Sequence, residues 1–292
     1  MESLFHIQGD ASSDLSPLFL IHAVSGFALP FLALGPLSAD TPSTSRPVYG
    51  LSCPIYQYKS YRLPHSLDEV AREYVARIQS ERPHGPYVLG GWSMGGMIAV
   101  RMAAILEEQG EEVLHVLLID SANPQGCPQY VDESERSAVG EWTYNAYSKP
   151  TGLPGLEAMA GEEESFDRGS DESDGQDCDD DVDILEYLPR MKEHIYNSWD
   201  MINRAGQADD LARGLASPVT LVKCTSLAAP PPGISEERKH AIRHRFEDDC
   251  AGWTMEKLKV IPVNAQHDDV FDGDHIDVVT DILRGVLERI KR

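Results

Sequence analysis

One junction between an apolar run and a helical pattern limits most strongly what this chain can fold into. The run Tyr87–Leu89 has the length and composition of a buried strand, and apolar residues recur at helical spacing from Met97 onward. Between them lies the sequence GWSMG, residues Gly91–Gly95. Its two glycines lack a Cβ, so a strand and a helix can approach closely there. The chain therefore needs a sheet whose strands lead directly into covering helices.

Strand and helix patterns alternate on both sides of this junction. Further buried strands are expected at Pro17–Ile21 and in the sequences PVYGLSCP, VLHVLLIDS, SPVTLVKC and LKVIPVN. Helices are expected in SLDEVAREYVARIQSE, after a capping Ser66 with Glu69 three residues on, and in MGGMIAVRMAAILEEQG, SEERKHAIRHRFEDD and HIDVVTDILRGVLERI. This order predicts an α/β protein with a mostly parallel central sheet flanked by helices.

The region 123–216 interrupts the alternation. It contains two helical patterns, at 133–147 and 185–205, on either side of an acidic tract at 157–183. The tract holds thirteen acids and one base, which is too much charge to bury, and it lacks the DxDxDG spacing of a calcium-binding loop. We expect a single domain over 1–292, with 123–216 inserted above the sheet as a helical lid and the acidic tract disordered.

Composition excludes several classes of function. The formal net charge of −23 argues against nucleic acid and anionic membranes as partners, and no apolar run is long enough to span a bilayer. The N-terminus does not resemble a signal peptide. Five widely spaced cysteines without a CxxC pair favour neither a disulfide framework nor a zinc site. We expect a cytoplasmic protein with no metal and no bound cofactor.

The GWSMG junction also predicts chemistry. A G-x-S-x-G sequence that follows a strand and opens a helix is typical of the nucleophile elbow of the α/β-hydrolase fold, and a purely structural turn is the alternative. The elbow would present Ser93 at the carboxyl edge of the sheet, where open α/β sheets bind ligands. A serine hydroxyl is a weak nucleophile that needs a base, and the base needs an acid to orient it. In this fold the three occur along the chain as serine, acid and histidine.

The acid is expected at Asp120. Most proteins of this fold carry it after the strand that follows the lid, but here that strand ends in Lys223-Cys224-Thr225-Ser226, without a carboxylate. Asp120 instead ends the apolar strand before the lid, where burying an unpaired carboxylate would cost much free energy. The alternative is a helix-capping or loop aspartate.

Two histidines compete for the role of base in the loop after the last strand. His267 follows that strand directly, whereas His275 lies where the final helix begins and fits a residue of its first turn. Because loops at strand ends carry catalytic residues, we favour His267. The other histidines, including His22, His194, His240 and His244, are expected at the surface or behind the site.

An oxyanion formed during attack by Ser93 would need two hydrogen-bond donors. One is the backbone N–H of Met94, the residue after the serine. The other is expected in the loop His22–Gly26 after the first core strand, at Val24 or, as the alternative, at Ala23.

The sequences RPVYGLSCP and ERPHGPYVLGGWSMGGMIAVRMAAILEEQGEEVLHVLLIDSANP resemble the thioesterase domain of polyketide and nonribosomal peptide synthetases. The chain is most similar to the domain at the end of fungal non-reducing polyketide synthases. The resemblance covers Pro17–Pro124 strongly and Leu258–Leu287 weakly, and it leaves the lid unmatched. It implies the triad Ser93, Asp120 and His267, the last within VNAQHDDVF. The loop IHAVSG has fewer glycines than is usual in this family.

The resemblance also implies a function. A serine-dependent thioesterase would take an acyl chain from the phosphopantetheine arm of an acyl or peptidyl carrier protein, or from coenzyme A, and release it by hydrolysis or cyclisation. A carboxylesterase or lactonase acting on small esters, and a non-catalytic binding protein of the same fold, are the alternatives.

Two sets of side chains would then matter for substrate and partner. The candidate lid walls are Trp142, Tyr144, Tyr147, Tyr187 and Trp199, with plain packing as the alternative. Carrier proteins are usually acidic, so docking on this acidic chain would need a basic patch. Its candidate members are Arg101, Arg238, Lys239, Arg243 and Arg245, and the part from Arg238 to Arg245 is alternatively a solvated helix face.

Overall fold

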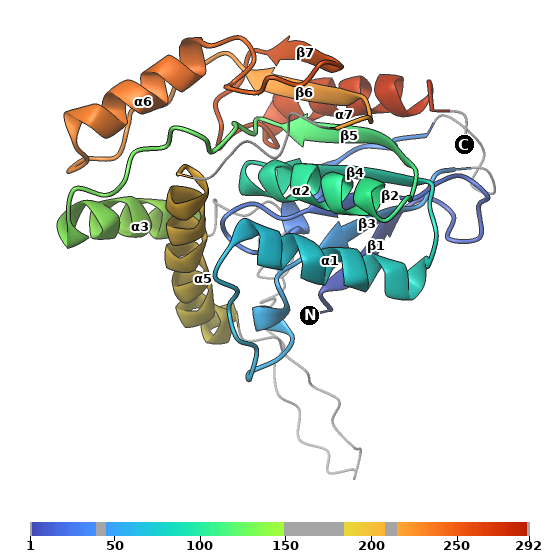
Figure 1. The fold of residues 1–292 in the computed structure, drawn as a ribbon, viewed down its shortest axis with the longest axis horizontal. Helices are drawn as coiled ribbons and strands as arrows, with labels where there is room; N and C mark the ends of the chain where they lie inside the picture. The colour runs from blue at the N-terminus through green and yellow to red at the C-terminus, as the bar shows by residue number, and fades with distance from the viewer. Residues whose placement is uncertain (1, 39–44, 149–183, 208–214, 291–292) are drawn as a thin grey trace, which may run out of the picture.

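The strands form one sheet that is parallel except at one edge. The computed structural model describes residues 2–38, 45–148, 184–207 and 215–290, and over these residues seven strands run in the order β1-β3-β2-β4-β5-β6-β7 (Figure 1). The strands are β1 (Leu4–Gln8), β2 (Leu18–Ile21), β3 (Val48–Leu51), β4 (Tyr87–Trp92), β5 (Val113–Ile119), β6 (Val219–Cys224) and β7 (Leu258–Val263). β1 pairs antiparallel with β3, and every other neighbouring pair of this sheet is parallel. The predicted α/β-hydrolase architecture of a mostly parallel sheet is therefore confirmed.

Helices cover both faces of the sheet (Figure 1). They are α1 (Leu67–Glu81), α2 (Met94–Glu108), α3 (Glu133–Tyr147), α5 (Ile184–Ala205), α6 (Glu236–Glu247) and α7 (Gly273–Leu287), with the short 3-10 helices η1 (Leu29–Ala33) and η3 (Pro54–Tyr56). α1 and α2 pack against each other on one face, and α7 lies on the other. The predicted cap of α1 is present, because Ser66 Oγ accepts from the Glu69 N–H at 3.1 Å. Within the described ranges, no helix is both long and apolar enough to cross a bilayer.

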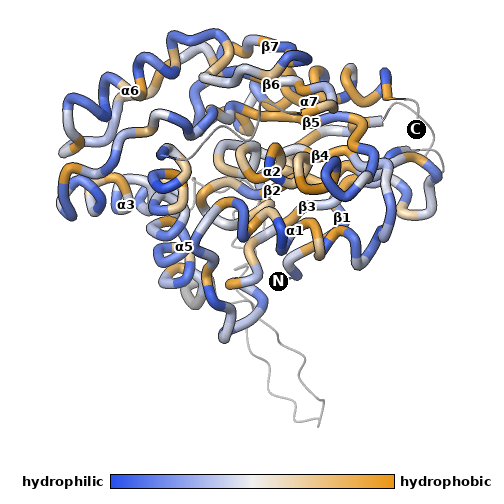
Figure 2. Tube along the Cα trace, viewed as in Figure 1, coloured by the Kyte–Doolittle hydropathy of each residue, from blue (hydrophilic) through white to orange (hydrophobic). Residues whose placement is uncertain are grey.

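The apolar sequences of β4 and β5 follow from their place in the middle of the sheet. Strands covered on both faces have no solvated side, so they do not alternate between polar and apolar residues. Every residue of β4 is buried, and so are the last four residues of β5. Figure 2 shows hydrophobic residues along the central strands and mostly hydrophilic residues along α6.

α3 and α5 come between β5 and β6 in the chain and lie beyond the carboxyl ends of the parallel strands (Figure 1). They pack on each other: Arg136 on α3 donates two hydrogen bonds of 2.8 Å to the Asp200 carboxylate on α5. The helices expected at 133–147 and 185–205 are both present, the second beginning one residue earlier. The lid role of 123–216 stays a prediction, and the acidic tract at 157–183 lies outside the described residues.

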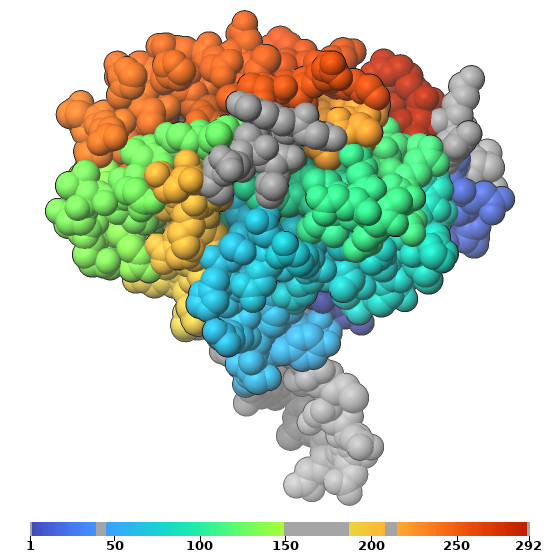
Figure 3. Space-filling view, in the orientation of Figure 1, coloured from blue at the N-terminus to red at the C-terminus, as the bar shows by residue number. Residues whose placement is uncertain are grey.

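α5 also packs against the segment that precedes α1. Asn197 Nδ2 donates to the Pro64 carbonyl and Arg204 Nε to the His65 carbonyl, each at 2.9 Å. Figure 3 shows this segment beside α5 at the surface of the molecule. α5 is thereby joined to the sheet domain by a side that is separate from its contact with α3.

One strand, β1, was not predicted by the sequence analysis. The register of this five-residue strand against β3 shifts between His6 and Gln8. An edge strand this short depends on pairing with β3, a contact that local sequence does not encode. α2 begins at Met94, the first residue of the expected helical sequence MGGMIAVRMAAILEEQG, because the turn at Ser93 leads straight into the helix.

The start of α2 packs against the backbone of β2. A Cβ added at Gly95 would lie 2.1 Å from the carbonyl oxygen of Ile21, and one added at Gly91 would lie 2.2 Å from the carbonyl carbon of Gly95. Both contacts involve backbone, which cannot turn aside as a flexible side chain can. Glycine at these two positions is therefore required by packing.

We expect Gly95→Ala to lower the free energy of unfolding by at least about 2 kcal/mol, because the new methyl group overlaps backbone atoms. Gly285→Ala on α7 is the matched control. A Cβ there meets nothing within 4 Å, and replacing a helical glycine by alanine stabilises by about 0.5–1 kcal/mol. Urea unfolding of both variants measures the effect, and equal stability of the two would contradict the packing constraint.

Candidate active site

The predicted elbow is present between β4 and α2. Ser93 has φ 55° and ψ −122°, a conformation that costs a non-glycine residue about 1–3 kcal/mol. Its backbone N–H donates to the Ile119 carbonyl of β5 at 3.0 Å, which anchors the turn to the neighbouring strand. The side chain is thereby presented at the carboxyl edge of the sheet, in the place that the GWSMG sequence predicts.

Ser93, His267 and Asp120 are joined in one chain of hydrogen bonds. Ser93 Oγ lies 3.0 Å from His267 Nε2, and His267 Nδ1 lies 2.6 Å from Asp120 Oδ2. A carboxylate only accepts, so Nδ1 carries the proton and the neutral ring offers Nε2 to the serine hydroxyl. The competing His275 lies in the first turn of α7, where its Nδ1 is 3.1 Å from the Asp269 carbonyl.

Asp120 is held by β6 as well as by the imidazole. Its Oδ1 accepts a hydrogen bond of 2.9 Å from the Cys224 N–H at the end of β6. The strand whose end lacks a carboxylate thus supplies a backbone donor to the carboxylate of the strand beside it. Asp120 itself has φ 39°, a left-handed conformation that aspartate tolerates better than most residues.

The contacts between Asp120 and His267 shift both pKa values. Burial raises the pKa of Asp120, but hydrogen bonds from His267 and the Cys224 N–H and the charge of His267 outweigh burial, so the pKa lies below its usual range. Burial lowers the pKa of His267, but the hydrogen bond to Asp120 and its negative charge outweigh burial, so the pKa lies above its usual value. The carboxylate therefore stabilises the imidazolium that forms when Nε2 takes up a proton.

Trp92 packs against the imidazole and was not singled out by the sequence analysis. Its ring centroid lies 5.6 Å from that of His267 and 5.1 Å from that of Phe271. The indole thus forms one wall beside the histidine. Its position directly before Ser93 could have marked Trp92 as a neighbour of the site. That position in G-x-S-x-G carries no fixed residue type, so the motif alone does not point to a tryptophan.

The three residues open into a cavity of about 320 Å³. Its walls come from α3, α5, α6 and the loop before α6, and they are mostly apolar. Of the five aromatic residues considered for the lid, Trp142, Tyr147 and Trp199 line the cavity. Tyr144 and Tyr187 are not among its lining residues and pack against the core instead.

The two backbone donors expected for an oxyanion, at Val24 and Met94, lie on the segments that follow β2 and Ser93. Val24 lines the same cavity as Ser93, and Met94 is the first residue of α2. Within the described residues, neither the Val24 N–H nor the Met94 N–H donates a hydrogen bond to another group. Neither N–H therefore has an acceptor among the described residues.

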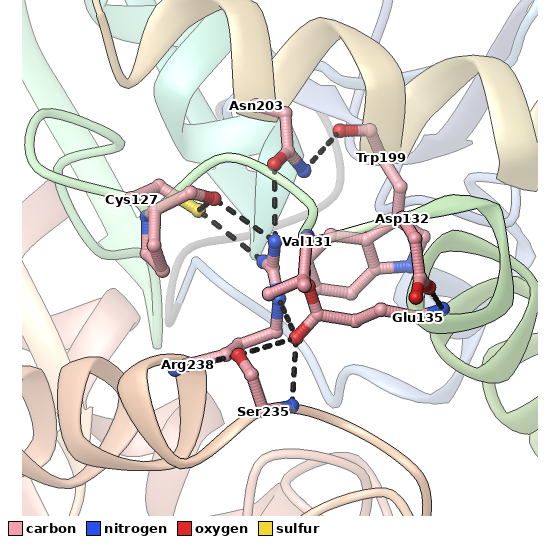
Figure 4. A network of polar contacts seen from close by, with 9 residues as sticks. Cys127, Val131, Asp132, Glu135, Trp199, Asn203, Ser235 and Arg238 are labelled. Carbon is pink, nitrogen blue, oxygen red and sulfur yellow. Dashed lines mark hydrogen bonds and ion pairs between the residues drawn. The ribbon is translucent and has the colours of Figure 1, made fainter.

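Arg238, which lines the cavity, belongs to a buried network of polar contacts (Figure 4). Glu135 on α3 and Arg238 on α6 are each 3% exposed, and Glu135 Oε1 lies 3.2 Å from Arg238 Nε. The Ser235 N–H and hydroxyl donate to the same carboxylate, at 2.8 and 2.7 Å. Arg238 also donates to the Pro128 carbonyl and to Asn203 Oδ1 on α5. Burial raises the pKa of Glu135, but these contacts hold it at about 2.

The prediction of a basic docking patch is wrong for three of its five residues. Arg238 is buried in the Glu135 network, and Arg101 is buried against Asp68, with Nε 3.1 Å from Oδ1. Arg245 donates to the carbonyls of Asn123 and Gln125. Of the five candidates, Arg243 is exposed, and Lys239 is paired with Glu236 on the same helix. Three of the five cations therefore support the fold.

Comparison with known proteins gives the family. A family model described as Thioesterase domain matches residues 16–141. Thioesterase pytI of Aspergillus terreus is 38% identical, over 99% of this chain and 100% of its own length. The chain belongs to the thioesterase family. Thioesterase pynI of Aspergillus niger is 36% identical, over 99% of each protein.

Other matches of this thioesterase are parts of larger enzymes or solved domains. The non-reducing polyketide synthase PKS12 of Gibberella zeae is 42% identical over 41% of this chain, which corresponds to 6% of that protein. Among solved structures, the NocB thioesterase domain, in covalent complex with a fluorophosphonate nocardicin G analogue, has a TM-score of 0.63 and 24% identity, over 97% of this chain and 99% of that one. The resemblance found in the sequence is therefore confirmed, and so is the fold.

We expect Glu135→Gln to lower the free energy of unfolding by about 3–5 kcal/mol, because it leaves the Arg238 charge buried without compensation. Glu236→Gln is the matched control. It removes an exposed pair with Lys239 on the same helix and should cost less than about 1 kcal/mol. Urea unfolding compares the two, and a double variant Glu135→Leu with Arg238→Met should recover part of the loss. Equal effects of the two single variants would show that the network does not stabilise the cavity wall.

Proposed function

We propose that this thioesterase uses Ser93 as a nucleophile to release an acyl chain from the phosphopantetheine thioester of an acyl or peptidyl carrier protein. The observation that carries the proposal is the chain of hydrogen bonds from Ser93 through His267 to Asp120 at one end of an apolar cavity. The polyketide context is supported by the similarity to non-reducing polyketide synthases, one of which is PKS12.

Acylation would begin with proton transfer to the imidazole. His267 Nε2 accepts the Ser93 proton as Oγ bonds to the thioester carbonyl carbon. Asp120 stabilises the imidazolium, in keeping with the raised pKa of His267. The carbon–sulfur bond then breaks, the imidazolium protonates the leaving sulfur, and an acyl-serine is left. The pantetheine thiol stays with the carrier, so the enzyme itself needs no bound cofactor.

The negative oxygen formed at each step would be held by the Val24 and Met94 N–H groups. Val24 lines the same cavity as Ser93, Met94 follows the serine directly, and neither N–H has a hydrogen-bond acceptor within the described residues. A donor of this kind contributes about 3 kcal/mol to the stability of the transition state. Backbone donors need no particular side chain, which agrees with the unusual sequence of the loop.

Deacylation would decide the product. Water activated by His267 would give a free acid, and a hydroxyl or carbanion within the acyl chain would give a lactone or a carbocycle. The walls from α3 and α5, including Trp142 and Trp199, would fold the acyl chain and select between these nucleophiles. In this reading, 123–216 acts as a lid over the acyl chain.

Carrier docking would depend on apolar contact more than on a basic patch. Three of the five candidate cations are engaged inside the fold. Leu227 lines the cavity and is 44% exposed, so it offers apolar surface where the pantetheine arm would enter. Coenzyme A thioesters carry the same arm and are the alternative acyl donors.

We expect a fluorophosphonate probe to label the native chain, and Ser93→Ala to abolish both labelling and thioester hydrolysis. Ser226→Ala is the matched control, because Ser226 lines the same cavity and bonds Asn264 instead of the imidazole. Intact mass spectrometry measures the adduct. A native chain that stays unlabelled would favour the non-catalytic alternative.

The same variants separate a thioesterase from a carboxylesterase or lactonase. An acyl-pantetheine thioester and the oxygen ester of the same acyl group are compared by kcat/KM. Faster turnover of the oxygen ester would contradict the thioesterase mechanism proposed for Ser93.

We expect kcat/KM of the native enzyme to rise with pH through an inflection above 6.5, because the neutral imidazole accepts the proton and the pKa of His267 is raised. Asp120→Asn removes the negative charge that raises the pKa of His267, while the burial that lowers this pKa remains. The inflection should therefore move to lower pH. The kcat should fall about 10⁴-fold. A pH profile with the acyl-pantetheine thioester measures both effects. Asp281→Asn, an exposed residue paired with Arg284, is the control, and an inflection that is unchanged in Asp120→Asn would contradict the assignment.

A further inference from the structure

The loop that follows β2 is held by buried side chains through its backbone carbonyls. His22 Nδ1 lies 2.7 Å from the Ala23 oxygen, and His194 Nδ1 lies 3.0 Å from the Val24 oxygen. The next carbonyl, of Ser25, accepts from the Tyr56 hydroxyl. Three successive carbonyls are thus bound by groups from the end of β2, from α5 and from η3.

The hydrogen bonds of His22 determine its tautomer. A carbonyl only accepts, so Nδ1 carries the proton, and Nε2 must accept from the Tyr74 hydroxyl 2.5 Å away. His22 is fully buried, and its pKa is lowered to about 3, first by burial and then by the repulsion that a protonated His194 would add. The ring is therefore neutral. The hydrogen bond that Tyr74 donates to Nε2 keeps the single ring proton of His22 on Nδ1, where it faces the Ala23 carbonyl.

The Ala23 carbonyl and the Val24 N–H belong to the same peptide unit. The carbonyl also accepts from the Gly26 N–H at 3.0 Å, so two donors fix the plane of this unit. Because an amide is delocalised, hydrogen bonds at its oxygen also make its N–H a stronger donor. The side chain of His22 can therefore act on a substrate oxygen through the backbone, without touching it.

His194 holds the next peptide unit from the side of α5. Its pKa is lowered to about 4 by burial, so this ring is also neutral and donates from Nδ1. The two imidazoles lie edge to face, with ring centroids 5.2 Å apart. α5 is thus joined to the loop that carries Val24.

We propose that His22 and His194 are positioning residues that hold the Val24 N–H toward the oxyanion, with Tyr74 selecting the tautomer of His22. The inference rests on the proposed function, in which Val24 is an oxyanion donor. It assigns a purpose to two buried histidines that the triad does not use. It also makes the position of the Val24 N–H depend on α5, so that a displacement of this helix would destabilise the transition state.

The test compares His22→Leu with His22→Asn, whose amide N–H can replace the Nδ1 donor. With the octanoyl thioester of N-acetylcysteamine, His22→Leu should lose about 10- to 100-fold in kcat with KM little changed, and His22→Asn should recover most of the loss. Octanoyl trifluoromethyl ketone, which forms a tetrahedral adduct with serine, should bind His22→Leu more weakly by a similar factor. Octanoic acid, which forms no oxyanion, should bind both variants equally.

Two further variants separate positioning from stability. His115→Leu removes a histidine outside this network, which is partly buried and hydrogen-bonded to Thr220 on β6. This variant should change stability without changing kcat. Tyr74→Phe keeps His22 in place, so it tests the tautomer even if His22→Leu fails to fold. Its kcat should fall several-fold, and ¹⁵N shifts of His22 should change from a pure Nδ1–H form to a mixture.

Several outcomes would overturn the inference. The first is a kcat equal to that of the native enzyme in folded His22→Leu. If only Tyr74→Phe folds, the same result in Tyr74→Phe counts instead. The second is a His22→Leu variant that loses kcat but binds the trifluoromethyl ketone as tightly as the native enzyme does. In those cases the native enzyme still hydrolyses the thioester, so the proposed function stands. A native chain that neither hydrolyses the thioester nor binds the ketone would overturn the proposed function and the inference together.

Discussion

The close approach of β2, β4 and α2 is the constraint on which the rest of the structure depends. Gly95 lies against the carbonyl of Ile21, and Gly91 lies against Gly95, so no side chain fits between the two strands and the helix. This contact holds Ser93 in a strained turn that a flexible loop would not keep. It also brings the carboxyl end of β2, which leads into the loop with Val24, against the start of α2. One packing contact thus positions both Ser93 and the loop that is expected to carry an oxyanion donor.

The parallel sheet brings the remaining groups to the same edge. Ser93 follows β4, Asp120 follows β5 and His267 follows β7, and the carboxyl ends of parallel strands meet. β6 lies between the last two and contributes the Cys224 N–H to Asp120. The acid can therefore follow either of two adjacent strands and still reach the histidine, since both strands end at one place.

Polar contacts organise the region around the cavity. Buried Glu135 and Arg238 join α3 to α6, partly exposed Arg136 and Asp200 join α3 to α5, and buried His194 joins α5 to the loop after β2. A buried pair such as Glu135 and Arg238 contributes definite geometry more than net stability. The walls of an acyl cavity need that definition, because their shape would decide which nucleophile reaches the ester.

The sequence by itself determined the local elements and the chemistry they can carry. Apolar runs, the capping Ser66 and the GWSMG turn predicted the strands, the helices and the place of Ser93, because these signals act over neighbouring residues. Asp120 and His267 could be chosen as candidates by their place after strands. Only the tertiary structure decided that His267 reaches Ser93 and that Asp120 reaches His267. It also decided that Arg238 is buried and that His22 and His194 bind one loop. These contacts join residues far apart in the chain, and local sequence does not encode which of them meet.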